Sequence, residues 1–207
     1  MRTRVKICGI TRPEDAAEAA RLGADAVGLI FADASPRRVD IAAAAAVRAA
    51  TPPFVSVVAL FMDASAAEVE QVLARVPVDL LQFHGSETRA YCELFPRPYV
   101  KVIPMGAAGE PADRMAEHPA AAGFVLDGHG AGEPGGSGRT FDWDRVPGGA
   151  RPIILAGGLT ADNAGRAVRQ VRPWAVDTSS GVESAPGVKD ARRMAAFISE
   201  VRRGTDD

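Results

Sequence analysis

Short apolar segments recur along the whole chain, and segments with helical or turn character separate them. Most of the apolar segments are continuous runs rather than alternations of apolar and polar residues. Continuous runs are typical of strands that are covered on both faces of a parallel sheet. Eight such strands are expected, at residues 4–8, 26–31, 54–61, 79–83, 99–103, 123–126, 152–155 and 174–177.

Amphipathic helices are expected between these strands. Apolar residues at i, i+3, i+4 and i+7 form one stripe along a helix. This spacing relates Val69, Val72, Leu73 and Val76, then Ala164, Ala167, Val168 and Val171, and again Ala191, Met194, Ala195 and Ile198. Helix starts are indicated by Ser65 and Thr160, which are favoured N-cap residues, and by Pro13 shortly after Thr11.

About eight strand–helix units indicate an α/β protein with a parallel closed sheet, the (β/α)8 TIM barrel. An open doubly wound sheet is the alternative, although it normally uses fewer strands for a chain of this length. No Pro-, Gly- or Ser-rich linker divides the chain, so a single domain over residues 1–207 is expected, with residues 204–207 as a frayed tail. The Gly-rich stretch 128–139 lacks apolar periodicity and is expected to be a loop.

The composition narrows the class of protein. With 47% hydrophobic residues, 24% charged residues and a formal net charge of -2, the 207-residue chain is typical of a globular protein. This charge argues against a nucleic-acid or anionic-membrane surface. Cys8 and Cys92 cannot form a disulfide framework, and no apolar run approaches the ~18 residues of a membrane helix. We therefore expect a cytoplasmic protein without nucleic-acid or membrane partners.

Reactive and backbone-permissive residues follow the expected strands rather than precede them. In a parallel barrel all strand C-termini meet on one face, where the sites of such enzymes lie. Gly157-Gly158 and Ser179-Ser180-Gly181 follow the seventh and eighth strands. Glycines there allow a ligand to approach the backbone, and successive N–H groups favour a phosphate. Plain turn glycines are the alternative interpretation.

Four further residues could carry chemistry, and each has a structural alternative. Cys8 ends the first strand and could be a small core residue, while Asp127 ends the sixth and could be a turn or cap carboxylate. Arg37 follows Ser35-Pro36 and, taken alone, is more typical of a solvated arginine. His84 is more typical of a hydrogen-bonded structural histidine than of a base. No His, Cys and Asp cluster has metal-ligand spacing, so no metal is expected.

Six motifs become recognisable when they are read together. They are Lys6-Ile7-Cys8-Gly9-Ile10-Thr11, Ser35-Pro36-Arg37, Leu81-Gln82-Phe83-His84-Gly85-Ser86-Glu87, Gly135-Gly136-Ser137-Gly138 with Phe141-Asp142-Trp143, Leu155-Ala156-Gly157-Gly158-Leu159, and Asp177-Thr178-Ser179-Ser180-Gly181-Val182-Glu183. In this order and spacing, from residue 4 to about residue 200, they resemble the phosphoribosylanthranilate isomerase family. Arg38 stands where that family commonly has an aromatic residue, and Thr178 stands where valine is usual.

The resemblance implies a (β/α)8 barrel and an Amadori rearrangement in tryptophan biosynthesis, and this chemistry requires no cofactor. It implies that Cys8 is the general base, that Asp127 is the general acid, and that Arg37 contacts the anthranilate carboxylate. Cys8 would then need a thiol pKa below ~8.5, and Asp127 would have to be protonated when it acts. The phosphate of the substrate is expected at Gly157, Gly158, Ser180 and Gly181.

Other functions are kept as alternatives. A histidine-pathway aminoaldose isomerase has similar chemistry but typically carries an aspartate at the first strand, where this chain has Cys8. Indole-glycerol-phosphate synthase uses catalytic lysines and a longer N-terminus. A non-catalytic sensor of phosphate ligands would keep Gly158 and Gly181 but would not need both Cys8 and Asp127. The motifs are compatible with a monomer or a homodimer.

Overall fold

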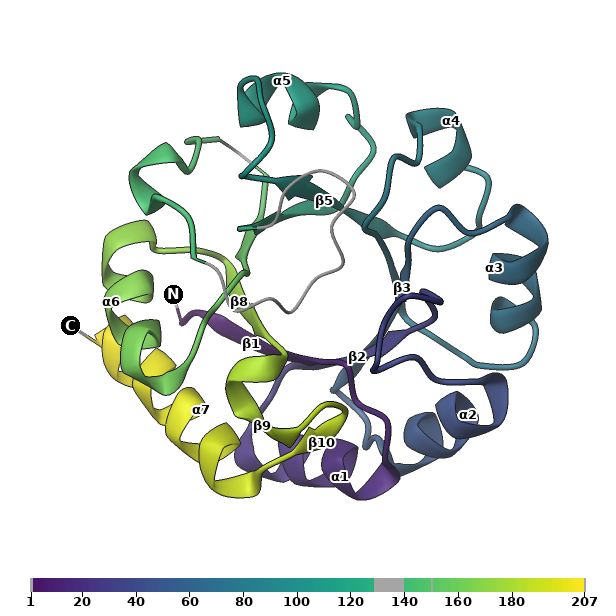
Figure 1. Ribbon diagram of the computed structural model, residues 1–207, viewed down its shortest axis with the longest axis horizontal. Helices are drawn as coiled ribbons and strands as arrows, with labels where there is room; N and C mark the ends of the chain where they lie inside the picture. Colours follow the sequence, from purple (N-terminus) through teal and green to yellow (C-terminus); the bar gives the residue numbers. More distant parts are fainter. Residues whose placement is uncertain (1, 129–139, 150, 207) are drawn as a thin grey trace.

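A closed barrel of eight parallel strands forms the centre of the protein. The structure is a computed structural model that describes residues 2–128, 140–149 and 151–206. The strands pair in chain order and the last pairs back with the first, so the predicted fold class is confirmed (Figure 1). They are β1 (Arg4–Cys8), β2 (Ala26–Ile30), β3 (Ser56–Phe61), β4 (Leu80–Phe83), β5 (Tyr99–Pro104), β6 (Gly123–Asp127), β7 (Ile153–Leu155) and β8 (Ala175–Thr178).

The continuous apolar runs reflect burial on both faces of the barrel wall. Along β1, Val5 and Ile7 belong to the large core between the strands and the surrounding helices. Because side chains alternate along a strand, Lys6 and Cys8 point to the other side, into the barrel. One strand starts later than expected: Phe54 has a φ of 70° and is fully exposed, so it belongs to the turn before β3.

A ring of helices surrounds the barrel (Figure 1). The α-helices are α1 (Pro13–Leu22), α2 (Ile41–Ala50), α3 (Ala66–Leu73), α4 (Arg89–Cys92), α5 (Pro111–Ala116), α6 (Ala161–Val171) and α7 (Ala191–Asp206). The predicted starts are confirmed at Pro13, which opens α1, and at Ser65, which forms a capping box with Glu68. Thr160 is the N-cap of α6, and its N–H donates to Asn163 Oδ1 at 2.9 Å.

The sixth strand–helix unit departs from the regular repeat. In the described part of the chain, β6 is followed by a single-turn 3-10 helix, η1 (Trp143–Arg145), where we expected an α-helix. Within the described residues, the sixth of the roughly eight strand–helix units that we expected therefore has no α-helix. Pro147, Gly148 and Gly149 follow η1 and interrupt any apolar stripe. The expected loop 128–139, except for Gly128, lies outside the described residues.

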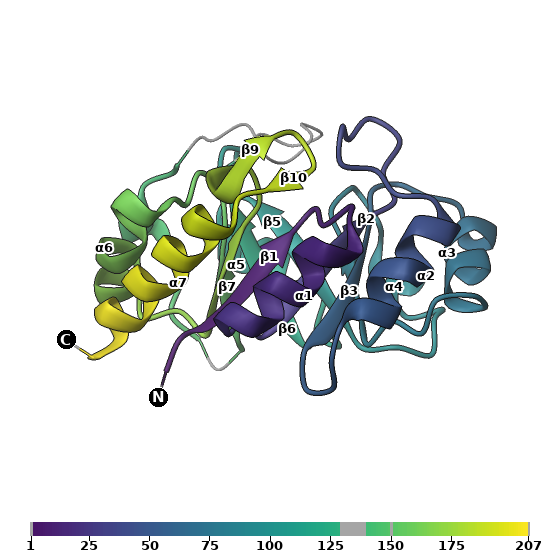
Figure 2. The same cartoon turned by 90° about the horizontal axis from the view of Figure 1, so that it is seen from below.

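The segment after β8 contains structure that the sequence did not predict. A 3-10 helix, η2 (Ser180–Val182), leads into a small antiparallel hairpin of β9 (Glu183–Ala185) and β10 (Val188–Lys189). Figure 2 shows this hairpin and the loop after β2 rising from one face of the barrel, while both termini lie at the opposite face. Residues 204–206, which we expected as part of a frayed tail, are the last residues of α7.

Candidate active site

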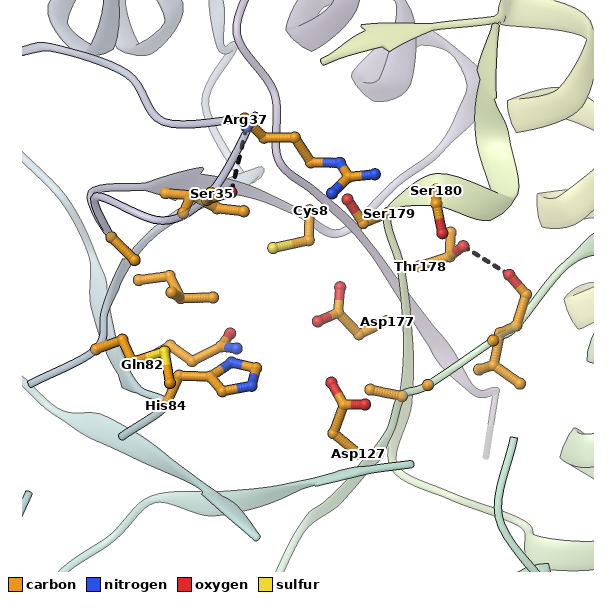
Figure 3. A pocket seen from close by; sticks show the side chains of 18 of the residues that line it. Cys8, Ser35, Arg37, Gln82, His84, Asp127, Asp177, Thr178, Ser179 and Ser180 are labelled. Carbon is orange, nitrogen blue, oxygen red and sulfur yellow. Dashed lines mark hydrogen bonds between the residues drawn. The ribbon is translucent and has the colours of Figure 1, made fainter. Parts of the chain in front are cut away.

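One pocket opens at the carboxyl ends of the barrel strands. Figure 3 shows side chains from several strands and loops converging on it. One wall is mainly apolar and comes from β2, β3 and the residues that follow them: Ile30, Ala32, Leu60 and Met62. The polar side chains of Gln82 and His84 lie on the same side of the pocket (Figure 3). The opposite wall is polar and comes from β1, β6, β7 and β8: Cys8, Asp127, Gly157, Gly158, Asp177, Thr178, Ser179 and Ser180. The pocket therefore offers one mainly apolar and one polar side to a ligand.

The structure brings the two expected acid–base residues into this pocket. Cys8 is the last residue of β1 and Asp127 the last residue of β6, and both side chains line the pocket (Figure 3). Both residues are buried. Burial raises the pKa of the Cys8 thiol above its ordinary value, while the Lys6 ammonium opposes that shift. The thiol is thus not acidified in the way that the sequence analysis required.

A buried ion pair that the sequence analysis did not single out lies beside Cys8. Lys6 Nζ donates to Asp177 Oδ2 at 2.8 Å, and both side chains are less than a tenth exposed. Burial and the nearby Asp127 carboxylate raise the pKa of Asp177. Burial alone would lower the pKa of Lys6, but Asp177 and Cys8 more than offset it, so the pKa of Lys6 is raised. The sequence signal that could have indicated this ion pair was a lysine two residues before Cys8 in a mainly apolar strand.

Arg37 is not the solvated surface arginine that its position alone favoured. Its residue is only 6% exposed, and it lines the pocket. Its Nε donates to Glu183 Oε1 and its Nη2 to Glu183 Oε2, both at 2.8 Å. A guanidinium has five N–H donors, so further donors are left for a ligand. The side chain crosses Gly9, where an added Cβ would lie 2.6 Å from Arg37 Cδ, and the φ of 72° at Gly9 also favours glycine.

Glu183 is the centre of a buried charged cluster on the β9–β10 hairpin. Besides Arg37, it accepts hydrogen bonds from Lys189 Nζ at 2.7 Å and from the Gly187 N–H at 3.2 Å. Burial would raise the pKa of Glu183, but the bonds from Arg37 and Lys189 outweigh this effect and lower it. Lys189 Nζ also donates to Ser179 O at 3.2 Å, so the cluster ties the hairpin to the pocket wall.

The two glycine-bearing loops differ in what their glycines do. Gly157 and Gly158 have φ values of 83° and 62° and line the pocket, so their backbone faces a ligand directly. Gly181 is not among the lining residues: its Cβ would collide with the Leu159 carbonyl oxygen and lie 2.8 Å from Thr178 Oγ1. Thr178 Oγ1 itself donates to Leu159 O at 2.8 Å. Gly181 therefore allows the two loops to pack closely.

His84, Cys92 and Lys101 differ in their relation to the pocket. His84 lines the pocket. Cys92 is buried in α4 and is not a lining residue. Lys101 supports the loop after β4, because its Nζ donates to Gly85 O at 2.6 Å and to Glu87 Oε2 at 3.2 Å. Within the described residues, no group of three or more His, Cys, Asp or Glu side chains could hold a metal ion, and no helix is long and apolar enough to cross a membrane.

Comparisons with known proteins show similarity to one enzyme family, both in sequence and in structure. The family model described as N-(5'phosphoribosyl)anthranilate (PRA) isomerase matches residues 5–200. The N-(5'-phosphoribosyl)anthranilate isomerase of Halorhodospira halophila is 55% identical over 206 residues, which cover 100% of both chains. Among solved structures, the phosphoribosyl anthranilate isomerase from Thermus thermophilus is 36% identical with a TM-score of 0.85, covering 96% of this chain and 98% of that one.

Two further structures describe states of such enzymes. One is a phosphoribosyl anthranilate isomerase in complex with reduced 1-(o-carboxyphenylamino)-1-deoxyribulose 5-phosphate, with a TM-score of 0.81, 32% identity, and coverage of 96% of this chain and 98% of that one. The other describes monomers generated from the dimeric enzyme of Thermotoga maritima, with a TM-score of 0.81, 31% identity and the same coverage.

Proposed function

The chain belongs to the N-(5'-phosphoribosyl)anthranilate isomerase family of tryptophan biosynthesis, and on this premise we propose how its pocket carries out the reaction. The substrate is N-(5-phosphoribosyl)anthranilate and the product is 1-(2-carboxyphenylamino)-1-deoxyribulose 5-phosphate. Cys8 is the general base and Asp127 is the general acid. The observation that carries the proposal is that these two residues end β1 and β6 and line one pocket together with Arg37 and Gly158.

The proposed chemistry needs one acid and one base. Protonated Asp127 gives its proton to the furanose ring oxygen, the bond between that oxygen and C1 breaks, and an iminium forms between C1 and the anthranilate nitrogen. The Cys8 thiolate then removes the proton from C2, and the released electron pair forms an enolamine. Protonation of C1 and loss of the C2 hydroxyl proton yield the ketone. The product is an isomer of the substrate, so no electrons are exchanged with a cofactor. General acid and general base catalysis of this kind contribute roughly 10²–10⁴-fold.

The two sides of the pocket support a defined orientation of the substrate. The apolar wall of Ile30, Leu60 and Met62 suits the aromatic ring, and the free N–H donors of Arg37 suit its carboxylate. The phosphate lies at the backbone of Gly157, Gly158 and Ser180 in this proposal. Gly181 contributes by holding the phosphate loops together. The ligand of the related enzyme carries both a carboxyphenyl group and a phosphate, which is consistent with such a two-ended site.

The proposal also concerns the cellular location and the oligomeric state of the enzyme. We propose a cytoplasmic protein, and the alternatives of monomer and homodimer remain predictions for this chain. The histidine-pathway isomerase, indole-glycerol-phosphate synthase and the phosphate sensor gain no support from the family match, which covers residues 5–200.

The test is a progress curve with freshly made phosphoribosylanthranilate, whose fluorescence is lost on isomerisation. Cys8→Ser replaces a thiol by a hydroxyl that hardly ionises near neutral pH, and Asp127→Asn removes the transferable proton. Each substitution should lower kcat at least ~10²-fold with a smaller effect on ligand affinity. Cys92→Ser is the control and should keep wild-type turnover. Near wild-type kcat in a folded Cys8→Ser variant, under conditions where chemistry limits the rate, would overturn the assignment.

A further inference from the structure

Lys6 is a buried lysine that the proposed chemistry does not use. It lies on β1 two residues before Cys8, so both side chains point into the barrel. Across the pairing of β1 with β8, Lys6 lies directly opposite Asp177, and its Nζ donates to Asp177 Oδ2 at 2.8 Å. Within the described residues, Asp177 Oδ1 is buried without a hydrogen-bond partner. The Lys6 ammonium is therefore the anchor of this carboxylate.

Gly28 shows how close the Lys6 ammonium and the Cys8 sulfur are. Gly28 lies on β2 opposite Cys8 in the strand register. A Cβ added at Gly28 would lie 2.7 Å from Cys8 Sγ and 3.1 Å from Lys6 Nζ. The Cys8 sulfur and the Lys6 ammonium therefore both lie next to the position that a Gly28 side chain would occupy. Because glycine has no side chain, this space is open to them. A β-carbon there would have to displace one of the two groups.

Several charged groups face Cys8, and Lys6 is the one on its own strand. Asp177 faces it from β8, Lys189 from β10, and Arg37 from the loop after β2. Burial is the largest influence on the thiol and favours its neutral form; Asp177 acts in the same direction, whereas Lys6 is the strongest opposing influence. Asp127 also acts on this group of charges through its repulsion of Asp177.

We propose that Lys6 is a positioning residue for Cys8: its buried ammonium, held by Asp177, stabilises the negative charge that forms on the sulfur when the thiol loses its proton. Asp177 has two opposite effects, because it fixes the ammonium in place and also draws part of its field away from the sulfur. The inference rests on the proposed function only for the catalytic use of the thiolate. The coupling between Lys6 and Cys8 is a separate property that can be measured without turnover.

The experiment measures the rate of alkylation of Cys8 by iodoacetamide as a function of pH, in a Cys92→Ser background. Lys6→Met removes the cation and should move the midpoint of the alkylation profile upward by about one pH unit or more. Asp177→Asn removes the competing carboxylate and should move the midpoint downward. Both variants break the same ion pair, so a merely structural role would move the midpoint in the same direction in both.

Lys101→Met is the matched control. Lys101 is also a buried lysine paired with a carboxylate, but its partners are Glu87 and the loop after β4. In Lys101→Met, the midpoint of Cys8 alkylation should equal that of the Cys92→Ser parent. An unchanged or lowered midpoint in Lys6→Met overturns the inference. If Lys6→Met does not fold, Lys6→Gln takes its place, and an unchanged or lowered midpoint in that variant overturns the inference. Retained turnover in Cys8→Ser would sink the proposed function while leaving the measured coupling intact.

Discussion

Glu183→Gln tests the charged cluster that holds Arg37 at the pocket. The carboxylate accepts two bonds of 2.8 Å from Arg37 and one of 2.7 Å from Lys189, and all three side chains are buried. Glutamine has nearly the same shape but is neutral, and its amide NH2 would face a cationic donor. The substitution therefore removes one acceptor and leaves two buried cations without a compensating charge.

The expected loss of stability follows from these contacts. A hydrogen bond to a charged group contributes roughly 1.5–3 kcal/mol, and removing one partner of a buried ion pair costs about 3–5 kcal/mol. Because glutamine keeps one acceptor, we expect a loss of about 3 kcal/mol. A domain with a free energy of unfolding of roughly 5–15 kcal/mol stays folded after such a loss.

The assay is urea unfolding of the wild type and two variants. With a denaturant slope of about 2 kcal/mol per molar urea, the midpoint of Glu183→Gln should fall by about 1.5 M. Glu93→Gln is the control, because it removes the same charge from an exposed pair with Arg89. Exposed pairs contribute at most about 1 kcal/mol, so its midpoint should fall by less than about 0.5 M. Equal midpoints for the two variants would refute the reasoning.

The pH dependence of the free energy of unfolding tests the same charged cluster independently. The pKa of Glu183 is lowered in the folded protein, mainly because the bonds from Arg37 and Lys189 outweigh burial. Its contribution to stability is therefore fully present above the ordinary pKa of 4.5 and is lost as the pH falls through the lower folded value. The gap between wild type and Glu183→Gln should be complete at neutral pH and should narrow below pH 4.5. A gap that widens on acidification would contradict the assignment.

Substitutions at three positions probe the pocket and the residues that support it. Arg37→Lys should raise KM because an ammonium cannot replace the fork of a guanidinium, and Arg37→Ala should raise it further; equal kinetics for Arg37→Ala and wild type would remove Arg37 from the site. Gly181→Ala should lower the midpoint of thermal unfolding as well as raise KM, because its Cβ collides with the Leu159 carbonyl; an effect on KM alone would show that Gly181 acts only on the ligand. Gly28→Ala should slow alkylation of Cys8 at neutral pH, since its Cβ separates the sulfur from the Lys6 ammonium, and an unchanged rate would contradict the described geometry.

The barrel itself could be predicted from the sequence because its signal is local. Burial on both faces makes each strand a continuous apolar run, so the expected strands match the observed ones to within two residues at either end. Strand order then places Cys8 and Asp127 on one face. The hairpin Glu183–Lys189 escaped prediction because its strands are only three and two residues long and carry charged side chains.

The partners inside the pocket could not be predicted, because they depend on contacts between distant segments. Arg37 and Glu183 are 146 positions apart, and Lys6 and Asp177 are 171 positions apart. Taken alone, Arg37 has the features of a solvated residue, and only the folded barrel shows the carboxylate that holds it. The environment of Cys8 could not be predicted either, since position at a strand end says nothing about how far burial disfavours the thiolate.

The pairing of β1 with β8 also bears on how the chain reaches its native state. Every other pair in the barrel joins strands that are neighbours in the sequence, whereas this seam joins the first strand to the last. Pairings of such high sequence separation form slowly, because the entropy of the long intervening chain opposes them. During synthesis the edge of β1 therefore stays open until β8 has left the ribosome. Inward-pointing charges discourage open edges from joining those of other molecules. We expect Lys6 to protect the half-built barrel from aggregation until Asp177 arrives.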